Sequence, residues 1–454
     1  MRRLACALVA LCGLAAQAET PPNIIYIMAD DLGYGDLGCY GQNTIKTPYI
    51  DAMASEGMRF TQAYAGSTVC APSRCALMTG KHTGQAYVRG NVLVPLADSE
   101  VTVAEVLKTR GYDTALIGKW GIAEPGTEGV PNKQGFDYFF GYLNQMHAHN
   151  YYPDYLWRNE EKVTLDNVDP GDGVSTVTKT YSHDLFAQEA LDYVAREHDK
   201  PFFLYLALTL PHANNERGGK EGNGMEVPDL APYEDNDWPA PQKGHAAMIT
   251  RLDRDVGRLM QALKDHGLDE NTIVFFTSDN GPHAEGGAKP EFFRSAGDLN
   301  GKKRDLTDGG IKVPMIVRWP GHVEAGSESD LVWAFWDFLP TAAALADAEP
   351  PKDINGISVL PTLLGQEGQQ QHDYLYWEFF EGGFLQGVRM KNWKGIRRDF
   401  RRFELYDLNA DPGEKTNVAD EHPEVVNQIA GIMDQARTDS EHFPIPEKAL
   451  RNKK

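Results

Sequence analysis

The run Cys70-Ala71-Pro72-Ser73-Arg74 holds the residue types best suited to chemistry in this sequence. Proline is favoured in the first turn of a helix, where its fixed φ fits and its missing N–H would have no partner. Gly80 can end the same helix. Backbone N–H groups and the helix dipole favour an anion at a helix N-terminus, so Cys70 is expected to lie beside an anion site. The alternative is an ordinary buried cysteine at a helix start.

A pair of side chains with oxygen ligand atoms follows each of two expected strands. Asp30 and Asp31 come directly after the apolar residues 23–28, and Asp279 and Asn280 follow the apolar residues 273–277. In an open α/β sheet, ligands bind at the carboxyl ends of the strands. Adjacent carboxylates repel each other and bind a cation, and oxygen ligands suit Ca²⁺ or Mg²⁺. A bare Asp-Asp pair can also be a solvated turn.

Three basic side chains follow the same pattern. Lys119 ends the segment after residues 114–117, His212 follows residues 201–208, and Lys303 precedes the next expected strand at residues 314–317. Each alone is compatible with a solvated lysine or a simple turn. Together with Cys70 and the acids, they bring carboxylates, cations and a nucleophile to one sheet edge.

These motifs resemble the type I, formylglycine-dependent sulfatases of the alkaline-phosphatase-like superfold. The resemblance extends from about residue 23 to Leu405-Tyr406-Asp407-Leu408 and includes Gly118-Lys119-Trp120. It implies that a formylglycine-generating enzyme oxidises Cys70 to an aldehyde. The hydrate of that aldehyde offers two hydroxyls where a thiol would attack a sulfate ester poorly.

The resemblance also implies roles for individual residues. It places Ca²⁺, in preference to Mg²⁺, on a set of five residues: Asp30, Asp31, Asp279, Asn280 and the modified Cys70. Arg74 and Lys119 would stabilise the hydrate. His212 and Lys303 would contact the sulfate and the leaving oxygen, with His212 as proton donor. One position departs from the family: its usual histidine after the lysine motif is Gly121 here, and His147 or His149 could replace that donor or bind sugar.

The elements that would position these residues indicate an α/β fold. Short β-branched runs alternate with amphipathic helical stretches, which predicts a mostly parallel central sheet flanked by helices. A glutamine-rich stretch at 366–371 reads as a linker. We therefore expect a signal peptide at residues 1–18, a catalytic domain at 19–370 and a smaller C-terminal α+β subdomain at 371–454.

Composition narrows the class of protein. Residues 1–18 combine two arginines, an apolar run and Ala16-Gln17-Ala18, which predicts export to the periplasm or the medium. Removal of Arg2 and Arg3 takes the formal net charge from −21 to −23. Nucleic acid is therefore not expected as a partner, because its binding requires phosphate neutralisation. No later segment is apolar and long enough to insert stably in a membrane.

We therefore predict hydrolysis of a sulfate monoester on a carbohydrate. The segment 123–180 is rich in aromatics, which could pack on sugar faces, and His147, His149, His283 and Arg304 could bind hydroxyls. The glycan sulfatases that the chain resembles suggest exo-action on galactose or N-acetylgalactosamine, at position 4 before position 6. The alternatives are a phosphomonoester or phosphonate hydrolase of the same superfold and a non-catalytic glycan-binding homologue.

Overall fold

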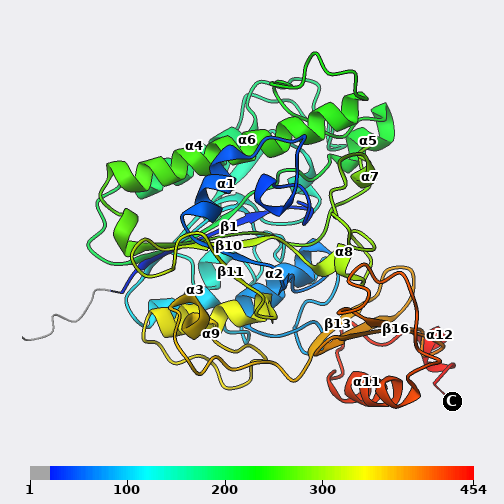
Figure 1. Ribbon diagram of the computed structural model, residues 1–454. Coiled ribbons are helices and arrows are strands. Elements are labelled where there is room, and N and C mark those ends of the chain that lie inside the picture. Colours follow the sequence, from blue (N-terminus) through cyan, green and yellow to red (C-terminus); the bar gives the residue numbers. More distant parts are fainter. Residues whose placement is uncertain (1–20, 454) are drawn as a thin grey trace, which may run out of the picture.

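A ten-stranded mixed sheet forms the centre of the computed structural model, which describes residues 21–453 (Figure 1). In spatial order its strands are β11 Ser327–Ser329, β2 Met58–Phe60, β10 Met315–Arg318, β9 Thr272–Ser278, β1 Asn23–Ala29, β8 Phe202–Ala207, β4 Asp113–Lys119, β5 Tyr138–Tyr142, β6 Tyr155–Arg158 and β7 Glu161–Thr164. Strands β9, β1, β8, β4 and β5 run parallel to one another, whereas β10, β6 and β7 pair antiparallel with their neighbours.

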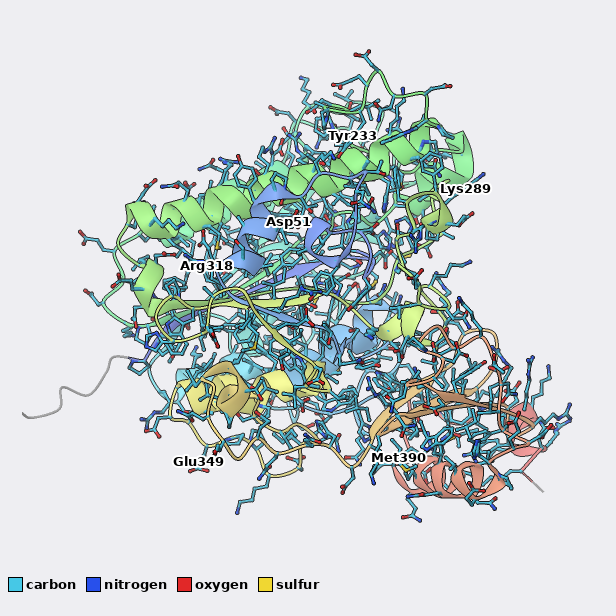
Figure 2. All side chains as sticks on the ribbon, in the orientation of Figure 1. Asp51, Tyr233, Lys289, Arg318, Glu349 and Met390 are labelled. Carbon is cyan, nitrogen blue, oxygen red and sulfur yellow. The ribbon has the colours of Figure 1, made fainter. Side chains whose placement is uncertain are left out.

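Both faces of the central strands are buried, which explains their continuous apolar sequence. In β1, Tyr26 faces one apolar core and Ile25 and Ile27 face the other. Helices α2, α3 and α9 cover the first face and helices α1, α4 and α6 the second, as Figure 1 shows. Side chains fill the space between these layers (Figure 2). The sheet is therefore a rigid platform between two helical layers.

The helices are short apart from α6. Their bounds are α1 Pro48–Ser55, α2 Cys70–Thr79, α3 Val103–Lys108, α4 Ser182–Val194, α5 Asn215–Glu221, α6 Ala240–Asp265, α7 Pro290–Phe293, α8 Asp308–Ile311, α9 Phe338–Leu345, α10 Leu360–Leu363, α11 Pro423–Gln435 and α12 Glu447–Leu450. Helix α3 begins with a capping box, in which the Thr102 side chain accepts from the Glu105 N–H and the Glu105 side chain accepts from the Thr102 N–H.

A second, antiparallel sheet follows the glutamine-rich stretch. Its strands, in order, are β13 Leu375–Phe379, β14 Leu385–Met390, β15 Trp393–Arg398 and β16 Arg402–Asp407, and α11 packs on one face. The other face contacts the main sheet layer, where the Trp377 indole donates to the Ala65 carbonyl. The remaining paired strands, β3 Ala63–Tyr64 and β12 Trp333–Ala334, lie in the same contact region.

The aromatic-rich segment 123–180 contains β5, β6 and β7 and extends the sheet. Helix α6 starts at Ala240, where Pro239 and Pro241 suit the first turn. In strand β15, charged residues occupy half of the length. The expected signal peptide lies outside the described residues, and no described helix is long and apolar enough to cross a membrane.

Candidate active site

Four neighbouring strands deliver polar side chains to one edge of the main sheet. In the order β9, β1, β8, β4, their carboxyl ends lead to Asp279, Asp30, His212 and Lys119. Parallel pairing forces these ends to the same edge. The side chains that the sequence scatters over 250 residues are therefore neighbours in space.

Helix α2 begins at this edge with Cys70. All ten residues of the helix are buried, and it ends at Gly80, whose left-handed φ of 70° suits glycine. The Cys70 Sγ lies 3.4 Å from Asp30 Oδ1 and the residue is 1% exposed. Burial and the Asp30 charge raise the pKa of the Cys70 thiol well above its usual value. An unmodified Cys70 would therefore remain protonated, and a protonated thiol is a poor nucleophile.

The acidic residues form a fully buried cluster. The Asp31 N–H donates to Asp279 Oδ1 at 3.2 Å, and the Asn280 amide donates to Asp31 Oδ1 at 2.6 Å. Asp31 itself has a positive φ of 67°, an uncommon conformation for a non-glycine residue that often marks functional sites. The contacts fix the orientation of the oxygen atoms.

Each carboxylate has at least one close cation. Lys119 Nζ lies 2.6 Å from Asp30 Oδ2, and Lys303 Nζ lies 2.9 Å from Asp31 Oδ2. Arg74 Nη2 lies 2.8 Å from Asp279 Oδ2 and 3.4 Å from Asp30 Oδ2. Burial disfavours the charged form of Asp30, but the neighbouring positive charges, with Lys119 the largest among them, together outweigh that effect and hold the pKa of Asp30 below its usual range. The cations therefore lie beside the carboxylates next to Cys70.

His212 is held as a neutral imidazole. Its Nδ1 lies 2.6 Å from the Ala213 carbonyl, which can only accept, so Nδ1 carries the hydrogen. Nε2 then accepts from Lys303 Nζ at 3.1 Å. Burial and the Lys303 charge lower the pKa of His212 to about 3. In this arrangement the Lys303 ammonium is the charged donor of the pair.

The acidic cluster fits a hard divalent cation. Ligand atoms of Asp30, Asp31, Cys70 and His212 lie within 4.8 Å of one another. Asn280 Oδ1 is buried without a hydrogen-bond partner. Burial and the neighbouring Asp30 raise the pKa of Asp279 to about 7, so a bound cation would favour its ionised form. Carboxylate and amide oxygens suit Ca²⁺ or Mg²⁺.

A pocket of about 450 Å³ opens above Cys70 and includes two of the four candidate sugar-binding residues, His149 and Arg304. His149 stacks on His212 with ring centroids 5.0 Å apart. His147 instead packs against Tyr155, and His283 is buried with its Nε2 3.1 Å from the Pro211 carbonyl. The structure does not bring His147 and His283 to the pocket lining.

The aromatic residues of segment 123–180 are also placed away from this pocket. Tyr151 is fully buried in the core, and Tyr152 and Trp157 pack against core residues. Tyr155 lies between His147 and Trp157. These side chains therefore fill the interior beneath the added strands.

Several residues at or near the pocket escaped the sequence analysis. Glu285 accepts from Lys303 and pairs with Arg304, which also contacts Glu381 from the second sheet. Glu124 and Gln145 line the pocket itself. They lie in loops without a motif, and only the closeness of Glu285 to Asn280 in sequence could have indicated one of them.

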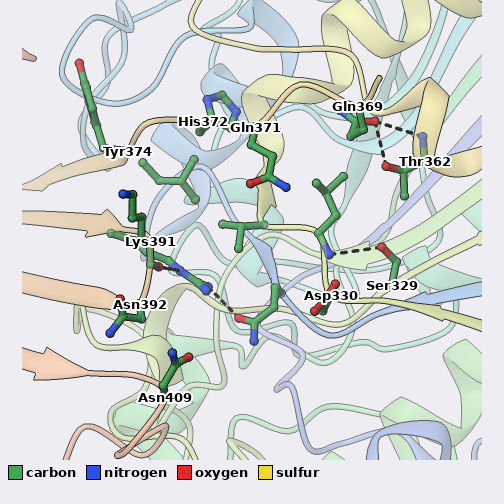
Figure 3. Close-up of a pocket in the computed structure, with 15 residues that line it drawn as sticks. Ser329, Asp330, Thr362, Gln369, Gln371, His372, Tyr374, Lys391, Asn392 and Asn409 are labelled. Carbon is green, nitrogen blue, oxygen red and sulfur yellow. Dashed lines mark hydrogen bonds between the residues drawn. The ribbon is translucent and has the colours of Figure 1, made fainter. Parts of the chain in front are cut away.

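A larger groove of about 610 Å³ lies between the two sheets (Figure 3). Amide side chains such as Gln371, Asn392 and Asn409 surround it, together with Asp330 and Lys391. Among the described residues that line it there is neither a cysteine nor a carboxylate pair. The pocket above Cys70 is therefore the better candidate for the active site.

Comparisons with known proteins agree with this geometry. The sequence profile of the family described as "Sulfatase" matches residues 22–348, and that of "N-sulphoglucosamine sulphohydrolase, C-terminal" matches residues 301–439. The chain is 31% identical to N-acetylgalactosamine-6-sulfatase of Rattus norvegicus, covering 95% of this chain and 83% of the relative. Identity to N-acetylgalactosamine-6-O-sulfatase of Bacteroides thetaiotaomicron is 30%, with coverage of 93% and 94%. The solved structure of Ps i-CgsB in complex with k-i-k-neocarrahexaose gives a TM-score of 0.79 at 27% identity, covering 95% of this chain and 96% of that one.

Proposed function

Because the chain belongs to the sulfatase family and is a sulfuric ester hydrolase, we propose that it removes sulfate from galactose or N-acetylgalactosamine in a glycan. The observation that carries this proposal is the presence of Cys70 and Lys303 in the lining of a pocket of about 450 Å³, with Arg74 and Lys119 buried against the neighbouring carboxylates. Such a pocket combines an anion site with room for one sugar ring.

The chain's own residues would perform the following roles. Oxidation of Cys70 and hydration of the aldehyde would supply two hydroxyls, one to attack sulfur and one to release sulfate afterwards. Arg74, Lys119 and Lys303 would offset the charge on the sulfate oxygens in the transition state. Asp30, whose Oδ1 lies 3.4 Å from Cys70 Sγ, would accept a hydrogen bond from a hydrate hydroxyl at that position.

Proton delivery to the leaving alcohol would involve His212 together with Lys303. The sequence favours His212 alone as the donor, but its neutral state and its contact with the Lys303 ammonium indicate a shared proton. A divalent cation held by Asp30, Asp31, Asp279 and Asn280, with Ca²⁺ the preferred ion, would act as a Lewis acid on the sulfate oxygens.

The relatives change the preferred position of the ester. Position 4 was favoured over position 6 by the resemblance, whereas two similar relatives carry the name N-acetylgalactosamine-6-sulfatase or -6-O-sulfatase. We therefore favour 6-sulfated N-acetylgalactosamine or galactose, with exo-action on a terminal residue.

The test is sulfate release from galactose and N-acetylgalactosamine sulfated at defined positions, by enzyme coproduced with a formylglycine-generating enzyme. We expect 6-sulfated sugars to be cleaved fastest, and an aryl phosphate to be cleaved far more slowly than an aryl sulfate. Equal activity on the phosphate, or cleavage of aryl sulfates far above every sugar, would contradict the carbohydrate assignment. Maturation is checked by the mass of the peptide containing Cys70, which falls by about 18 Da on conversion to the aldehyde.

We also propose that the protein is exported after removal of residues 1–18. The basic start followed by an apolar run and Ala16-Gln17-Ala18 supports this proposal. N-terminal sequencing of the protein recovered from the periplasm and the medium tests it, and retention of residue 1 in the mature protein would contradict it.

A further inference from the structure

One part of the Cys70 pocket lining, called the wall below, consists of residues 91–95, 121–124 and 144–146. Its side chains differ in character from those of the sulfate site. Across these segments there is no lysine or arginine, and Val92, Leu93 and Met146 are 54%, 65% and 60% exposed. Exposed apolar groups gathered at a pocket mark a contact surface, here one suited to the apolar face of a sugar ring.

One carboxylate oxygen on this wall has no partner. Glu124 Oε2 accepts from the Asn144 amide at 3.1 Å, whereas Glu124 Oε1 is buried and has no hydrogen-bond partner among the described residues. No ion pair within residues 21–453 involves Glu124. A buried acceptor without a partner is destabilising and requires an explanation, such as a ligand that donates to it. A sugar hydroxyl is such a donor, whereas a sulfate group offers only acceptors.

The second polar group is the Gln145 amide, which lies where a side chain at position 121 would be if residue 121 were not glycine. A Cβ built on Gly121 would lie 2.5 Å from Gln145 Nε2 and 3.4 Å from Arg74 Cδ. The Gln145 amide donates to the Gly121 carbonyl at 3.0 Å. Neither His147 nor His149 makes this contact in the structure. Gln145 therefore occupies the side-chain space beside Gly121, and its carbonyl oxygen has no partner among the described residues.

The Asn144 side chain holds the Glu124 carboxylate in place. Asn144 donates to Glu124 and accepts from the His147 N–H at 3.0 Å, so it ties the 121–124 segment to the 144–149 segment. Such support fixes an acceptor before the ligand arrives, which strengthens binding.

We propose that Glu124 and Gln145 form the sugar-recognition subsite of this enzyme, in which they accept hydrogen bonds from ring hydroxyls while the sulfate binds at Lys303. This inference rests on the proposed function and specifies its substrate contact. It makes the two residues determinants of specificity for a hydroxylated leaving group, without a part in cleavage of the S–O bond.

The experiment compares Glu124→Gln and Gln145→Ala with wild type on two substrates, the best monosulfated sugar and 4-nitrophenyl sulfate. The aryl ester has no hydroxyl for the wall to bind. We expect each variant to lower kcat/KM on the sugar by about 10- to 100-fold, the range for a hydrogen bond involving a charged or buried group, and on the aryl ester by less than about threefold. Glu128→Gln, an exposed glutamate four residues along, is the matched control and should match wild type on both.

A second readout separates recognition from catalysis. In a Cys70→Ala background, calorimetric titration with the desulfated sugar should show binding that Glu124→Gln weakens by a similar factor. Equal losses on both substrates, or unchanged sugar kinetics with unchanged binding, would overturn the subsite. If wild type cleaves the aryl ester and no sugar, the proposed carbohydrate function is wrong. That outcome differs from a failure of the subsite alone, in which wild type still cleaves the sugar. Thermal midpoints of all variants identify any loss caused by misfolding.

Discussion

Among the individual side chains, the central feature is a buried set of opposite charges. Asp30, Asp31 and Asp279 are each fully buried, and each contacts at least one cation. The pKa of Asp279 is nevertheless raised to about 7 by burial and by Asp30. Removing one member of such a cluster leaves an uncompensated buried charge, which is strongly destabilising. These residues are therefore expected to affect both stability and turnover.

Metal removal should reveal the cation at this cluster. We expect dialysis against a chelator to lower activity by at least tenfold and to lower Tm by several degrees, because a ligand that binds only the folded state stabilises it. Ca²⁺ should restore both more effectively than Mg²⁺. The control is Asp279→Ala, whose Tm should no longer respond to the chelator. The metal assignment would be contradicted if the chelator changed neither the Tm nor the activity of wild type and elemental analysis of the protein found no metal.

The two adjacent lysines at 302 and 303 offer a matched test of the sulfate site. Lys303 is buried against Asp31 and His212, whereas Lys302 is exposed. We expect Lys303→Met to lower kcat by about 10²- to 10³-fold, the usual loss for one donor that stabilises developing charge. Lys302→Met should stay within twofold. Similar kinetics for the two variants would remove Lys303 from the site.

At the element scale, the sequence predicted the strands that carry chemistry better than those at the sheet edges. The prediction of an α/β fold with a largely parallel centre is confirmed, because β1, β4, β8 and β9 are buried on both faces and read as continuous apolar runs. Strands β6 and β7 lie at an edge, where exposed residues such as Glu161 and Lys162 interrupt the apolar pattern.

Helix α1 has a cap that no local pattern could indicate. Its own N-cap residue Thr47 makes no side-chain capping bond, and the Asp253 carboxylate on α6 accepts from the Tyr49 and Ile50 N–H groups instead. Asp253 is 1% exposed, and burial raises its pKa to about 7 despite these bonds. Capping by a residue 200 positions away is visible only in the folded structure.

This cap predicts a pH dependence of stability. Folding raises the pKa of Asp253, so the folded state binds a proton that the unfolded state releases above about pH 4. The associated stability is complete below pH 4 and is lost as the pH rises toward 7. Asp253→Asn keeps an acceptor oxygen without the charge, so wild type should lose stability relative to this variant between pH 4 and 7, by about 4 kcal/mol at most. Parallel pH curves from denaturant titrations would contradict the assignment.

For the molecule as a whole, the sequence predicted the residues grouped around Cys70 but not the pocket residues Glu124, Gln145 and Glu381. The sulfatase family assignment is confirmed, and Cys70, Asp30 and Lys119 lie together as the strand-end argument requires. The roles of these residues stay predictions. Glu124, Gln145 and Glu381 lie on three separate loops that line the pocket, and none of these loops carries a motif that marks it in the sequence.

The second sheet is tied to the catalytic layer by a buried charge cluster. Lys394 on β15 is fully buried, with its Nζ 2.8 Å from Asp308 Oδ1 and 3.4 Å from Glu414 Oε1. Asp308 begins α8, which follows the loop carrying Lys303. Burial raises the pKa of Glu414 to about 7, so the Glu414 carboxyl is partly protonated at physiological pH. The ion pair thus connects the C-terminal sheet to the segment that presents a sulfate-binding lysine.

Breaking this cluster should loosen both sheets together. We expect Lys394→Met to destabilise the fold by about 3–5 kcal/mol, because Asp308 would remain buried without its cation. Adding Glu414→Gln should recover part of that loss, since the two changes act on the same cluster. Lys391→Met, an exposed lysine on the neighbouring turn, is the control and should change stability by less than about 0.5 kcal/mol. If the cluster also positions Lys303, kcat of the Lys394→Met enzyme, measured at a temperature well below its Tm, should be lower than that of wild type. A normal kcat with reduced stability would limit the cluster to a structural role.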